Sequence, residues 1–576
     1  MIVFTASVVA VAPAAAQPSS MVANWDEDAL ANSAVPAVLN EEERAHYRRL
    51  FAAIDAENWD AVREGLGLYP ASPLYQVALA EYYTHANSPK VSAGQVADWF
   101  DLGVELPQAE QIGRIGLNRG LEMLPMLPQS QRLSRQPGPS KRMRPRPVRD
   151  GSISDATSAA ILEAIRGDDP YTARALLAEA ENGLSSAARA EWRQRVAWSF
   201  YIENDDRAAL AMARTVGEGT GPWVAEGEWV AGLAAWRLGD CDLASDAFAR
   251  AAQGSTNIEL TAAAHYWAHR ALIRCRRPDA AQPHLAGAAR FDETLYGMLA
   301  IDQQGIETPA AAPAEPFDGE DWAALQHRSN IRTAAALAEI GRQGLADQVL
   351  RHEVRIGPSG NYPALARLAR ELGLPSTQLF MASNAPYGQS ADPALRFPVA
   401  RWQPSTGWRV DPSLAFAHAL QESNFRAAAV SPANARGLMQ IMPGTARDHN
   451  RQLNLGASYA DLNDPEVNLA YGQQHLEMLR DSSATQGLLP KIMAAYNAGL
   501  TPVERWNYEI NDQGDPLLWM ESIPYWETRG YVAIVMRNYW MYERAAGVPS
   551  PSRHALVRGE WPRFPQAHAR RSAAAR

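Results

Sequence analysis

The sequence has few cysteines, no strand-like alternation of polar and apolar residues, and no long apolar run beyond its first twenty positions. Its two cysteines, Cys241 and Cys275, are too few for a disulfide-built scaffold and lack the histidine spacing of a zinc site. Their separation is close to one helical hairpin, so they can pair in an oxidising compartment or lie buried as small apolar residues. Without an apolar run of ~18 residues, no integral membrane segment is expected.

The remaining composition favours an all-α protein with several domains. At 576 residues the chain is too long for one hydrophobic core, and a hydrophobic content of 47% is enough for several. Alanine is abundant and 17 tryptophans are spread along the chain, which suits closely packed helices. The net charge of −10 argues against a nucleic-acid-binding protein.

Residues 1–16 predict a secretory signal peptide. Their apolar run ends in Ala14-Ala15-Ala16, which is similar to the small residues of a cleavage site. The basic residues that usually begin such a signal are missing, so an upstream start or a disordered alanine-rich terminus is the alternative. We therefore expect an exported protein.

Residues 128–150 interrupt the helical pattern. Several prolines lie there among seven basic residues. One interpretation is a basic flap over an acidic substrate. We favour the other interpretation, a solvated and poorly packed loop.

The most informative stretch runs from Asp411 to Arg447. Asp411-Pro412 predicts a helix start, because Asp can cap a helix and Pro suits its first position. Apolar residues then recur at helical spacing up to Glu422, where the periodicity breaks. The negative end of the helix dipole and any burial would both raise the pKa of Glu422, as a general acid requires. The alternative is a solvated surface charge, since most glutamates are exposed.

Three motifs around this glutamate resemble those of the soluble lytic transglycosylases of the bacterial cell wall, which have a goose-lysozyme-like catalytic domain. The first joins Glu422 to a turn at 431–435 and to residues 437–443 (GLMQIMP). The second is 494–499 (AAYNAG), and the third is 521–532 (ESIPYWETRGYV). They occur in the family's order, and the resemblance covers about residues 397–542.

Two residues depart from the family pattern. Asn434 stands where the family often has Gly, and Asn is the next best residue for a positive φ, so the turn should survive. Leu420 stands where the family commonly has Arg. This change implies either a drier wall behind Glu422 or only a lost ion pair.

The resemblance implies an all-α fold: a ring- or U-shaped superhelix of TPR-like helical hairpins followed by a lysozyme-like α-helical catalytic domain. The alanine-rich helices and their aromatic residues at 225–275 fit this architecture. After the signal peptide we expect a superhelical domain at 17–310 that contains the basic loop, a helical linker domain at 311–390, the catalytic domain at 391–550 and a C-terminal tail at 551–576, with disorder at 570–576.

The resemblance also implies roles for single residues. Glu422 is the expected catalytic residue. The expected substrate-binding residues are Ser423, Ser431, Met439, Gln440, Met442, Tyr496, Asn497, Glu521 and Glu527. Taken alone, Met439, Met442 and Tyr496 fit core packing equally well. Likewise, Glu521 and Glu527 fit surface ion pairs, for example with Arg529.

In this family one glutamate acts first as acid and then as base. It would protonate the bond between N-acetylmuramic acid and N-acetylglucosamine, and the C6 hydroxyl would then close onto C1 without water. One alternative is a goose-type lysozyme that uses water as acceptor. Another is a helical scaffold that binds glycan without cutting it, although such a scaffold would have no need to keep Glu422.

The resemblance further implies which molecules the protein meets. Peptidoglycan glycan strands would be its substrate in the periplasm, and proteins of cell-wall synthesis are candidate partners. No nucleic-acid partner, metal or organic cofactor is expected, and the expected oligomeric state is a monomer.

Overall fold

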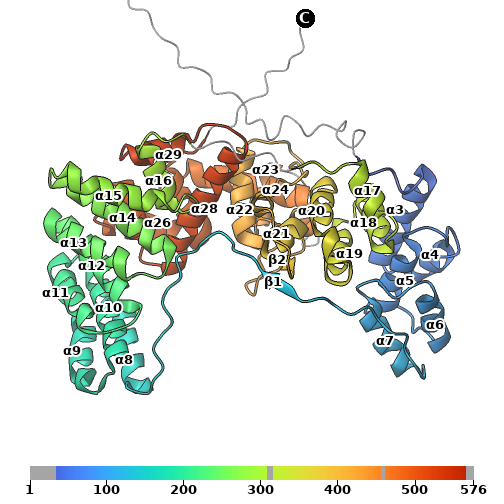
Figure 1. The fold of residues 1–576 in the computed structure, drawn as a ribbon, viewed down its shortest axis with the longest axis horizontal. Helices are drawn as coiled ribbons and strands as arrows, with labels where there is room; N and C mark the ends of the chain where they lie inside the picture. Colours follow the sequence, from blue (N-terminus) through green and yellow to red (C-terminus); the bar gives the residue numbers. More distant parts are fainter. Residues whose placement is uncertain (1–33, 308–314, 454, 456–460, 566–576) are drawn as a thin grey trace, which may run out of the picture.

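The computed structural model describes residues 34–307, 315–453, 455 and 461–565, and they fold almost entirely into helices (Figure 1). This confirms the predicted all-α class. Among the described residues the only sheet has two short strands, β1 (Leu133–Arg135) and β2 (Asn384–Pro386), paired antiparallel. The signal peptide predicted at 1–16 and the disorder predicted at 570–576 lie outside the described residues.

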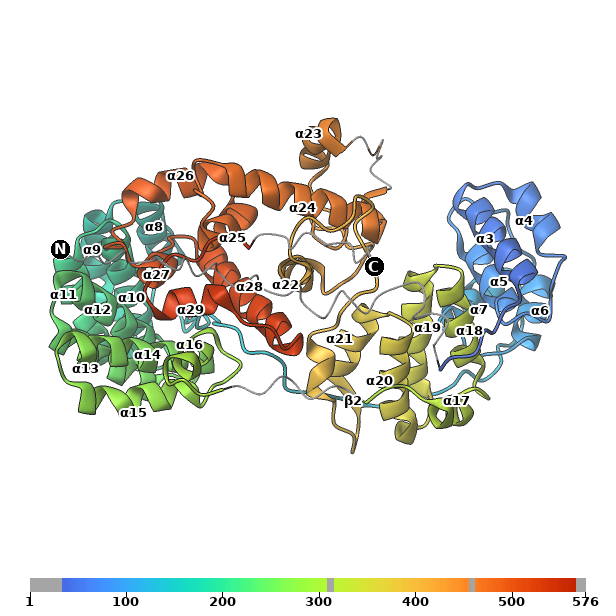
Figure 2. The same cartoon turned by 90° about the horizontal axis from the view of Figure 1, so that it is seen from above.

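One end of the molecule, which we call the first body, combines helices from two distant parts of the sequence (Figure 2). Its early helices are α3 (Glu41–Asp55), α4 (Trp59–Gly65), α5 (Tyr75–Thr84), α6 (Ala93–Asp101) and α7 (Ala109–Asn118). Its later helices are α17 (Gly319–Leu325), α18 (Ser329–Glu339), α19 (Gln343–Ile356), α20 (Tyr362–Glu371) and α21 (Pro375–Ser383). Both sets contribute to one hydrophobic core, so the predicted division at 310 does not match the packing.

The opposite end, the second body, is a stack of antiparallel helices. They are α8 (Asp155–Arg166), α9 (Pro170–Ala180), α10 (Ser186–Ile202), α11 (Asp206–Thr215), α12 (Trp223–Leu238), α13 (Cys241–Gly254), α14 (Ile258–Arg274), α15 (Pro278–Ala289) and α16 (Leu295–Gln303). Small residues let neighbouring helices approach: a Cβ at Gly232 would lie 2.5 Å from the Phe248 ring. Trp229 and Trp267 fill the remaining space, with ring centroids 6.4 Å apart.

The third body lies between the other two (Figure 2). It contains α22 (Pro412–Ser423), α23 (Pro443–Leu453), α24 (Pro465–Asp481), α25 (Leu489–Ala498), α26 (Leu500–Glu509), α27 (Pro516–Glu521), α28 (Trp526–Ala545) and α29 (Pro551–Val557). Its core is continuous with that of the second body. In Figure 1 both ends extend below this middle part, so the outline of the whole molecule is an arch.

Residues 119–150, which we call the strap, cross from the first body to the second (Figure 1). Gln131 donates to the Val354 and Gly357 carbonyls, both at 2.9 Å, and β1 pairs with β2 in the first body. Further along, Arg142 lies 2.9 Å from Glu521 and 3.3 Å from Glu226, largely removed from solvent. The expectation of a poorly packed loop is therefore wrong at these positions, because partners far away in the sequence satisfy their polar groups. Most residues of 128–150 are nevertheless exposed, as a solvated segment would be.

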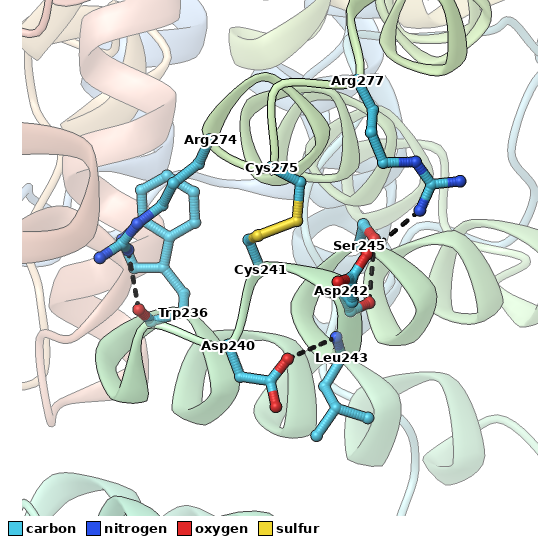
Figure 3. Close-up of a disulfide and its surroundings, with 9 residues drawn as sticks. All are labelled: Trp236, Asp240, Cys241, Asp242, Leu243, Ser245, Arg274, Cys275 and Arg277. Atoms are coloured by element: carbon cyan, nitrogen blue, oxygen red, sulfur yellow. Dashed lines mark hydrogen bonds and ion pairs between the residues drawn. A yellow bond between two sulfur atoms is a disulfide. The ribbon is translucent and has the colours of Figure 1, made fainter.

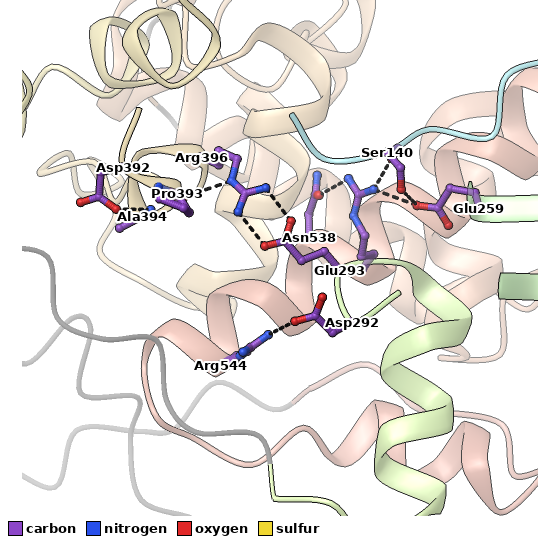
Figure 4. Close-up of polar contacts among 11 residues, drawn as sticks. Ser140, Glu259, Asp292, Glu293, Asp392, Pro393, Ala394, Arg396, Asn538 and Arg544 are labelled. Atoms are coloured by element: carbon purple, nitrogen blue, oxygen red, sulfur yellow. Dashed lines mark hydrogen bonds and ion pairs between the residues drawn. The ribbon is translucent and has the colours of Figure 1, made fainter. Parts of the chain in front are cut away.

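Ion pairs and hydrogen bonds also join the bodies beside the strap (Figure 4). Arg396, just after the first body, forms a two-pronged pair with Glu293 at 2.5 and 2.6 Å. In the strap, the Ser140 hydroxyl donates to Glu259 of the second body at 2.6 Å. A planar guanidinium facing a carboxylate fixes orientation as well as distance, so these contacts define how the bodies meet.

Cys241 and Cys275 form a disulfide, which settles the alternative left open by the sequence (Figure 3). Cys241 begins α13 and Cys275 follows the last residue of α14, so the bond closes one helical hairpin of the second body. Among the described residues, the one grouping spaced like metal ligands is this pair with Asp242, and its two sulfurs are bonded to each other.

The predicted tail at 551–576 begins with ordered structure instead. Helix α29 starts at Pro551, and Phe564 is buried in the shared core. The Phe564 amide donates to the Gly487 carbonyl at 2.9 Å. Apolar side chains at 556 and 564 explain why this stretch packs despite its prolines. Within the described chain, every helix is too short or too polar to cross a membrane.

Candidate active site

Helix α22 places Glu422 at its C-terminal end, as the sequence predicts. The Asp411 carboxylate accepts a hydrogen bond from the Ser413 amide at 2.9 Å and caps the first turn. The helix ends after Ser423, because Asn424 adopts the left-handed conformation with φ 51°. Leu420 is only 9% exposed and belongs to the shared hydrophobic core, so an apolar side chain replaces the family's Arg there.

Burial raises the pKa of Glu422 to about 7. Two smaller effects oppose each other: a hydrogen bond from Tyr531 lowers this pKa, and the nearby charge of Glu527 raises it. A carboxyl group with this pKa is protonated in much of the population near neutral pH and can still ionise. It can therefore donate a proton and later accept one.

Tyr531 and His418 form the wall behind this carboxyl group. The Tyr531 hydroxyl donates to Glu422 Oε1 at 2.7 Å, and His418 Nδ1 lies 2.8 Å from the same hydroxyl oxygen. Tyr531 comes from α28, whereas His418 precedes Glu422 by one turn of α22. The Tyr496 ring lies against both, 4.5 Å from the His418 centroid and stacked at 6.4 Å with Tyr531.

A cleft of about 290 Å³ is lined by several of the residues expected to bind substrate. Gln440, Met442 and Tyr496 contribute to its lining, together with His475. Met442 is 42% exposed and offers a soft apolar surface, while the Tyr496 hydroxyl is held by the Met439 carbonyl at 2.7 Å. A flat apolar patch beside amide groups is suited to a sugar ring.

A second hollow, of about 610 Å³, continues this cleft across shared residues such as Thr445 and His475. Asp448, Glu477 and Asp481 give it an acidic lining. The two hollows together form a groove rather than a closed pocket, which fits an extended ligand.

The loop that carries Gln440 is built from residues with special backbone geometry. Ser431 Oγ accepts from the Ala435 amide at 3.0 Å, and Asn434 has φ 67°, as expected for a residue that replaces Gly. Gly437 has φ 76°, and a Cβ there would meet Asn468 Nδ2 at 2.2 Å. These residues shape the loop, so Ser431 acts on the site through its backbone contacts.

Comparison with known proteins identifies this part of the chain. Residues 402–517 match the family model described as "Transglycosylase SLT domain". These residues belong to the SLT domain family. The soluble lytic murein transglycosylase of Escherichia coli K12 is 37% identical over 134 residues, and that of Salmonella typhimurium is 34% identical over 175 residues.

The sequence match to these relatives covers less than a third of either protein. The match to the E. coli relative covers 23% of this chain and 20% of that relative. The match to the S. typhimurium relative covers 29% of this chain and 26% of that relative. The fold likeness extends further. The E. coli 70 kDa soluble lytic transglycosylase structure covers 92% of this chain and 100% of its own, with TM-score 0.56 and 19% identity. The match to the Slt structure from Pseudomonas aeruginosa covers 89% of this chain and 74% of that chain, with TM-score 0.50 and 22% identity.

The SLT domain places three of the expected substrate-binding residues away from the cleft. Ser423 is buried and its hydroxyl donates to the Ala419 carbonyl, because the side chain points back into its own helix. Met439 is buried against Gly472, so core packing is its role. Glu521 is buried where the third body meets the second body. Its carboxylate pairs with Arg142, and its backbone carbonyl accepts a hydrogen bond from the Arg529 guanidinium at 3.2 Å.

Two further expected residues take supporting positions in the third body. Asn497 follows Tyr496 and accepts a hydrogen bond from the Thr528 hydroxyl at 2.7 Å, which ties α25 to α28. Glu527 is exposed and acts on Glu422 through its charge. A role of Glu527 in binding substrate stays a prediction.

Tyr531, His418 and His475 were not among the expected site residues. Tyr531 lies in the third motif, but nothing in its sequence surroundings indicates that it bonds to Glu422. His418 carried a local signal, since a histidine one turn before the acid lies on the same helical face. His475 shares the cleft lining with Tyr496 from a different helix, a contact that sequence spacing does not predict.

Proposed function

We propose that this protein is a peptidoglycan lytic transglycosylase of the periplasm. It would cleave the β-1,4 bond between N-acetylmuramic acid and N-acetylglucosamine and leave a 1,6-anhydro end. The observation that carries the proposal is Glu422, whose pKa is raised to about 7 within a matched SLT domain. Tyr496 lines the open groove and stacks on Tyr531, which donates to Glu422. Glycan strands are the substrate, and the protein acts as a monomer.

In the first step Glu422 donates its proton to the glycosidic oxygen, and the bond from that oxygen to C1 of N-acetylmuramic acid breaks. The neighbouring N-acetyl oxygen assists from within the sugar by forming a bond to C1. Glu422 is then a carboxylate. Tyr531 supports that charge with the hydrogen bond it donates to Oε1.

In the second step the C6 hydroxyl attacks C1 and gives its proton to Glu422, which restores the starting acid. The N-acetyl oxygen leaves C1 at the same time. Because the nucleophile is part of the same sugar, no water is consumed and the entropy cost is small.

A hydrolase is the second candidate, and the charge of Glu527 near Glu422 is the observation that favours it. Most glycosidases that use water need two carboxyl groups, one as acid and one as base or nucleophile. If Glu527 took the second role, its loss would abolish cleavage. If Glu422 takes both roles, Glu527→Gln should keep cleavage within about tenfold of wild type.

The test is a digest of purified peptidoglycan analysed by mass spectrometry, with wild type, Glu422→Gln and Glu527→Gln in parallel. We expect anhydro products, lighter than hydrolytic muropeptides by one water. Glu422→Gln should lower their rate of formation by about 100- to 10,000-fold. Reducing-end products would identify a hydrolase, and inactivity of the folded wild type on several peptidoglycans would favour a binding scaffold.

A further inference from the structure

The wall behind Glu422 contains a histidine that the proposed reaction does not use. His418 is fully buried, and its Nδ1 lies 2.8 Å from the Tyr531 hydroxyl oxygen, which itself lies 2.7 Å from Glu422 Oε1. Hydrogen bonds therefore link the imidazole, the phenol and the carboxyl group in one row. The direction of these hydrogen bonds decides which oxygen of Glu422 can carry the acidic proton.

The Tyr531 hydroxyl has one proton and two neighbours, so only two arrangements satisfy the row. In the first, His418 Nδ1–H donates to Tyr531, and Tyr531 donates to Glu422 Oε1. In the second, Glu422 Oε1–H donates to Tyr531, and Tyr531 donates to a bare Nδ1 of His418. The second arrangement points the acidic proton into the protein, where no substrate can receive it.

The surroundings of His418 Nε2 favour the first arrangement. His418 Nε2 is buried without a hydrogen-bond partner. In the first arrangement this nitrogen carries only a lone pair, whereas in the second it would be an orphaned N–H donor, which is the rarer case in proteins. Burial also lowers the pKa of His418 to about 3, so the ring is neutral and has a single proton to place.

We propose that His418 is a positioning residue that holds Tyr531 as a donor to Oε1 and thereby keeps the acidic proton of Glu422 on Oε2. This inference rests on the proposed function, because it assigns the oxygen that acts as acid and then as base. Tyr531 donates to Oε1 in both states of Glu422, so the row does not rearrange during the cycle. His418 keeps its proton throughout and never touches the substrate.

The groups around His418 are consistent with a ring that stays neutral. Tyr531 comes from α28, Tyr496 from α25 and His475 from α24, and Glu422 lies on the same helix. The Tyr496 ring packs at 4.5 Å, and the charge of a protonated His475 would lower the pKa of His418 further. Burial lowers the pKa of His475 itself to about 4, so this ring is neutral near pH 7 as well.

The kinetic test compares His418→Asn with His418→Leu. The Asn amide can place an N–H where Nδ1–H lies, whereas Leu of similar bulk cannot donate. We expect His418→Leu to lower kcat about tenfold, the size of one hydrogen bond to a charged group, with KM within about twofold. The alkaline limb of its kcat profile should move to higher pH, because Tyr531 is no longer held as a donor and can accept the proton of neutral Glu422, which stabilises the uncharged form. His418→Asn should keep kcat and profile near wild type.

A double mutant separates positioning from packing. If His418 acts through Tyr531, then adding His418→Leu to Tyr531→Phe should not lower kcat any further. The proposal would be overturned if the fold-decreases in kcat of the two single mutants multiplied in the double mutant. It would also be overturned if His418→Asn and His418→Leu lowered kcat equally at matched melting temperature.

A readout without substrate keeps this inference distinct from the proposed function. In protein with ¹⁵N-labelled histidine, the signals lost in His418→Asn identify His418. We expect a protonated Nδ1 and a bare Nε2 from about pH 5 to 8, where an ordinary histidine titrates. A protonated Nε2 with a bare Nδ1, or a charged ring in this range, would overturn the proposal even if wild type proved inactive on peptidoglycan.

Discussion

Glu422 shows how a single carboxyl group is balanced between burial, which opposes its charge, and one hydrogen bond, which favours it. Burial is the larger effect and raises the pKa of Glu422 to about 7 from an ordinary value of 4.5. The folded protein therefore binds a proton at Glu422 more tightly than the unfolded chain does. This contribution to stability is complete below about pH 4.5 and is lost as the pH rises through about 7.

Glu422→Gln should remove this dependence on pH. Relative to wild type, its free energy of unfolding should rise between about pH 4.5 and 7 by up to about 2–3 kcal/mol, since an uncharged amide has no proton to lose. Urea unfolding at several pH values measures the difference. Glu504→Gln, at an exposed position of α26, is the control, and its free energy of unfolding should depend on pH as that of wild type does. A difference in the free energy of unfolding between Glu422→Gln and wild type that does not vary with pH would contradict this account.

At the scale of elements, the loop at 437–443 depends on one glycine. Gly437 has φ 76°, and an added Cβ would lie 2.2 Å from Asn468 Nδ2 and 2.3 Å from the Leu462 carbonyl oxygen. Asn468 in turn accepts from the Met439 amide at 2.8 Å. Gln440 reaches the cleft from this loop. Displacing Asn468 would therefore shift the loop and move Gln440 from its position in the cleft lining.

Gly437→Ala should destabilise the third body by about 3 kcal/mol, which combines backbone strain with overpacking. Gly514→Ala is the matched control. It also has a positive φ, 79°, but no atom within 4 Å of its Cβ position, so it should cost only about 1 kcal/mol. Urea unfolding of both variants measures the difference, and equal losses would show that the close contact is unimportant.

Sequence reasoning succeeded where the signal is local. The cap at Asp411, the end of α22 at Glu422 and the positive φ of Asn434 all follow from neighbouring residues. It failed where a side chain is satisfied by a distant partner. Tyr531 reaches Glu422 across 109 positions, and Arg142 reaches Glu521 across 379, so neither contact leaves a periodic trace.

The same limit applies to the domain boundaries. Helices α3–α7 look like the start of the superhelix because their hairpins have the same pattern. Their apolar faces instead join α17–α21 in one core. The strap was expected to be solvated because prolines and basic residues are common in loops, yet the Arg142 guanidinium pairs with carboxylates in two bodies.

At the scale of the whole molecule, Arg142 joins the strap, the second body and the SLT domain. It pairs with Glu226 and Glu521, whose side chains are only 4% and 7% exposed, and lies 4.6 Å from the Trp229 ring centroid. The Tyr296 hydroxyl donates to the same Glu521 at 2.7 Å. Removing the cation would leave two buried carboxylates without their partner.

Arg142→Met should therefore lower the free energy of unfolding by about 3–5 kcal/mol, a loss typical of a broken buried ion pair. Arg135→Met is the control, since Arg135 is an exposed arginine of the same strap. Thermal unfolding followed by tryptophan fluorescence measures both variants. If Arg142→Met and Arg135→Met unfold alike, the buried pair does not join the bodies.

The first body also constrains the order in which the chain can fold during its synthesis. The Val38 amide donates to Glu339, 301 positions later, and Asn330 donates to the Glu105 carbonyl at 2.9 Å. Helices α3–α7 thus leave the ribosome with an apolar face whose cover is translated only after the entire second body. For that interval they depend on chaperones or remain unfolded, so they are among the last helices to reach their native packing.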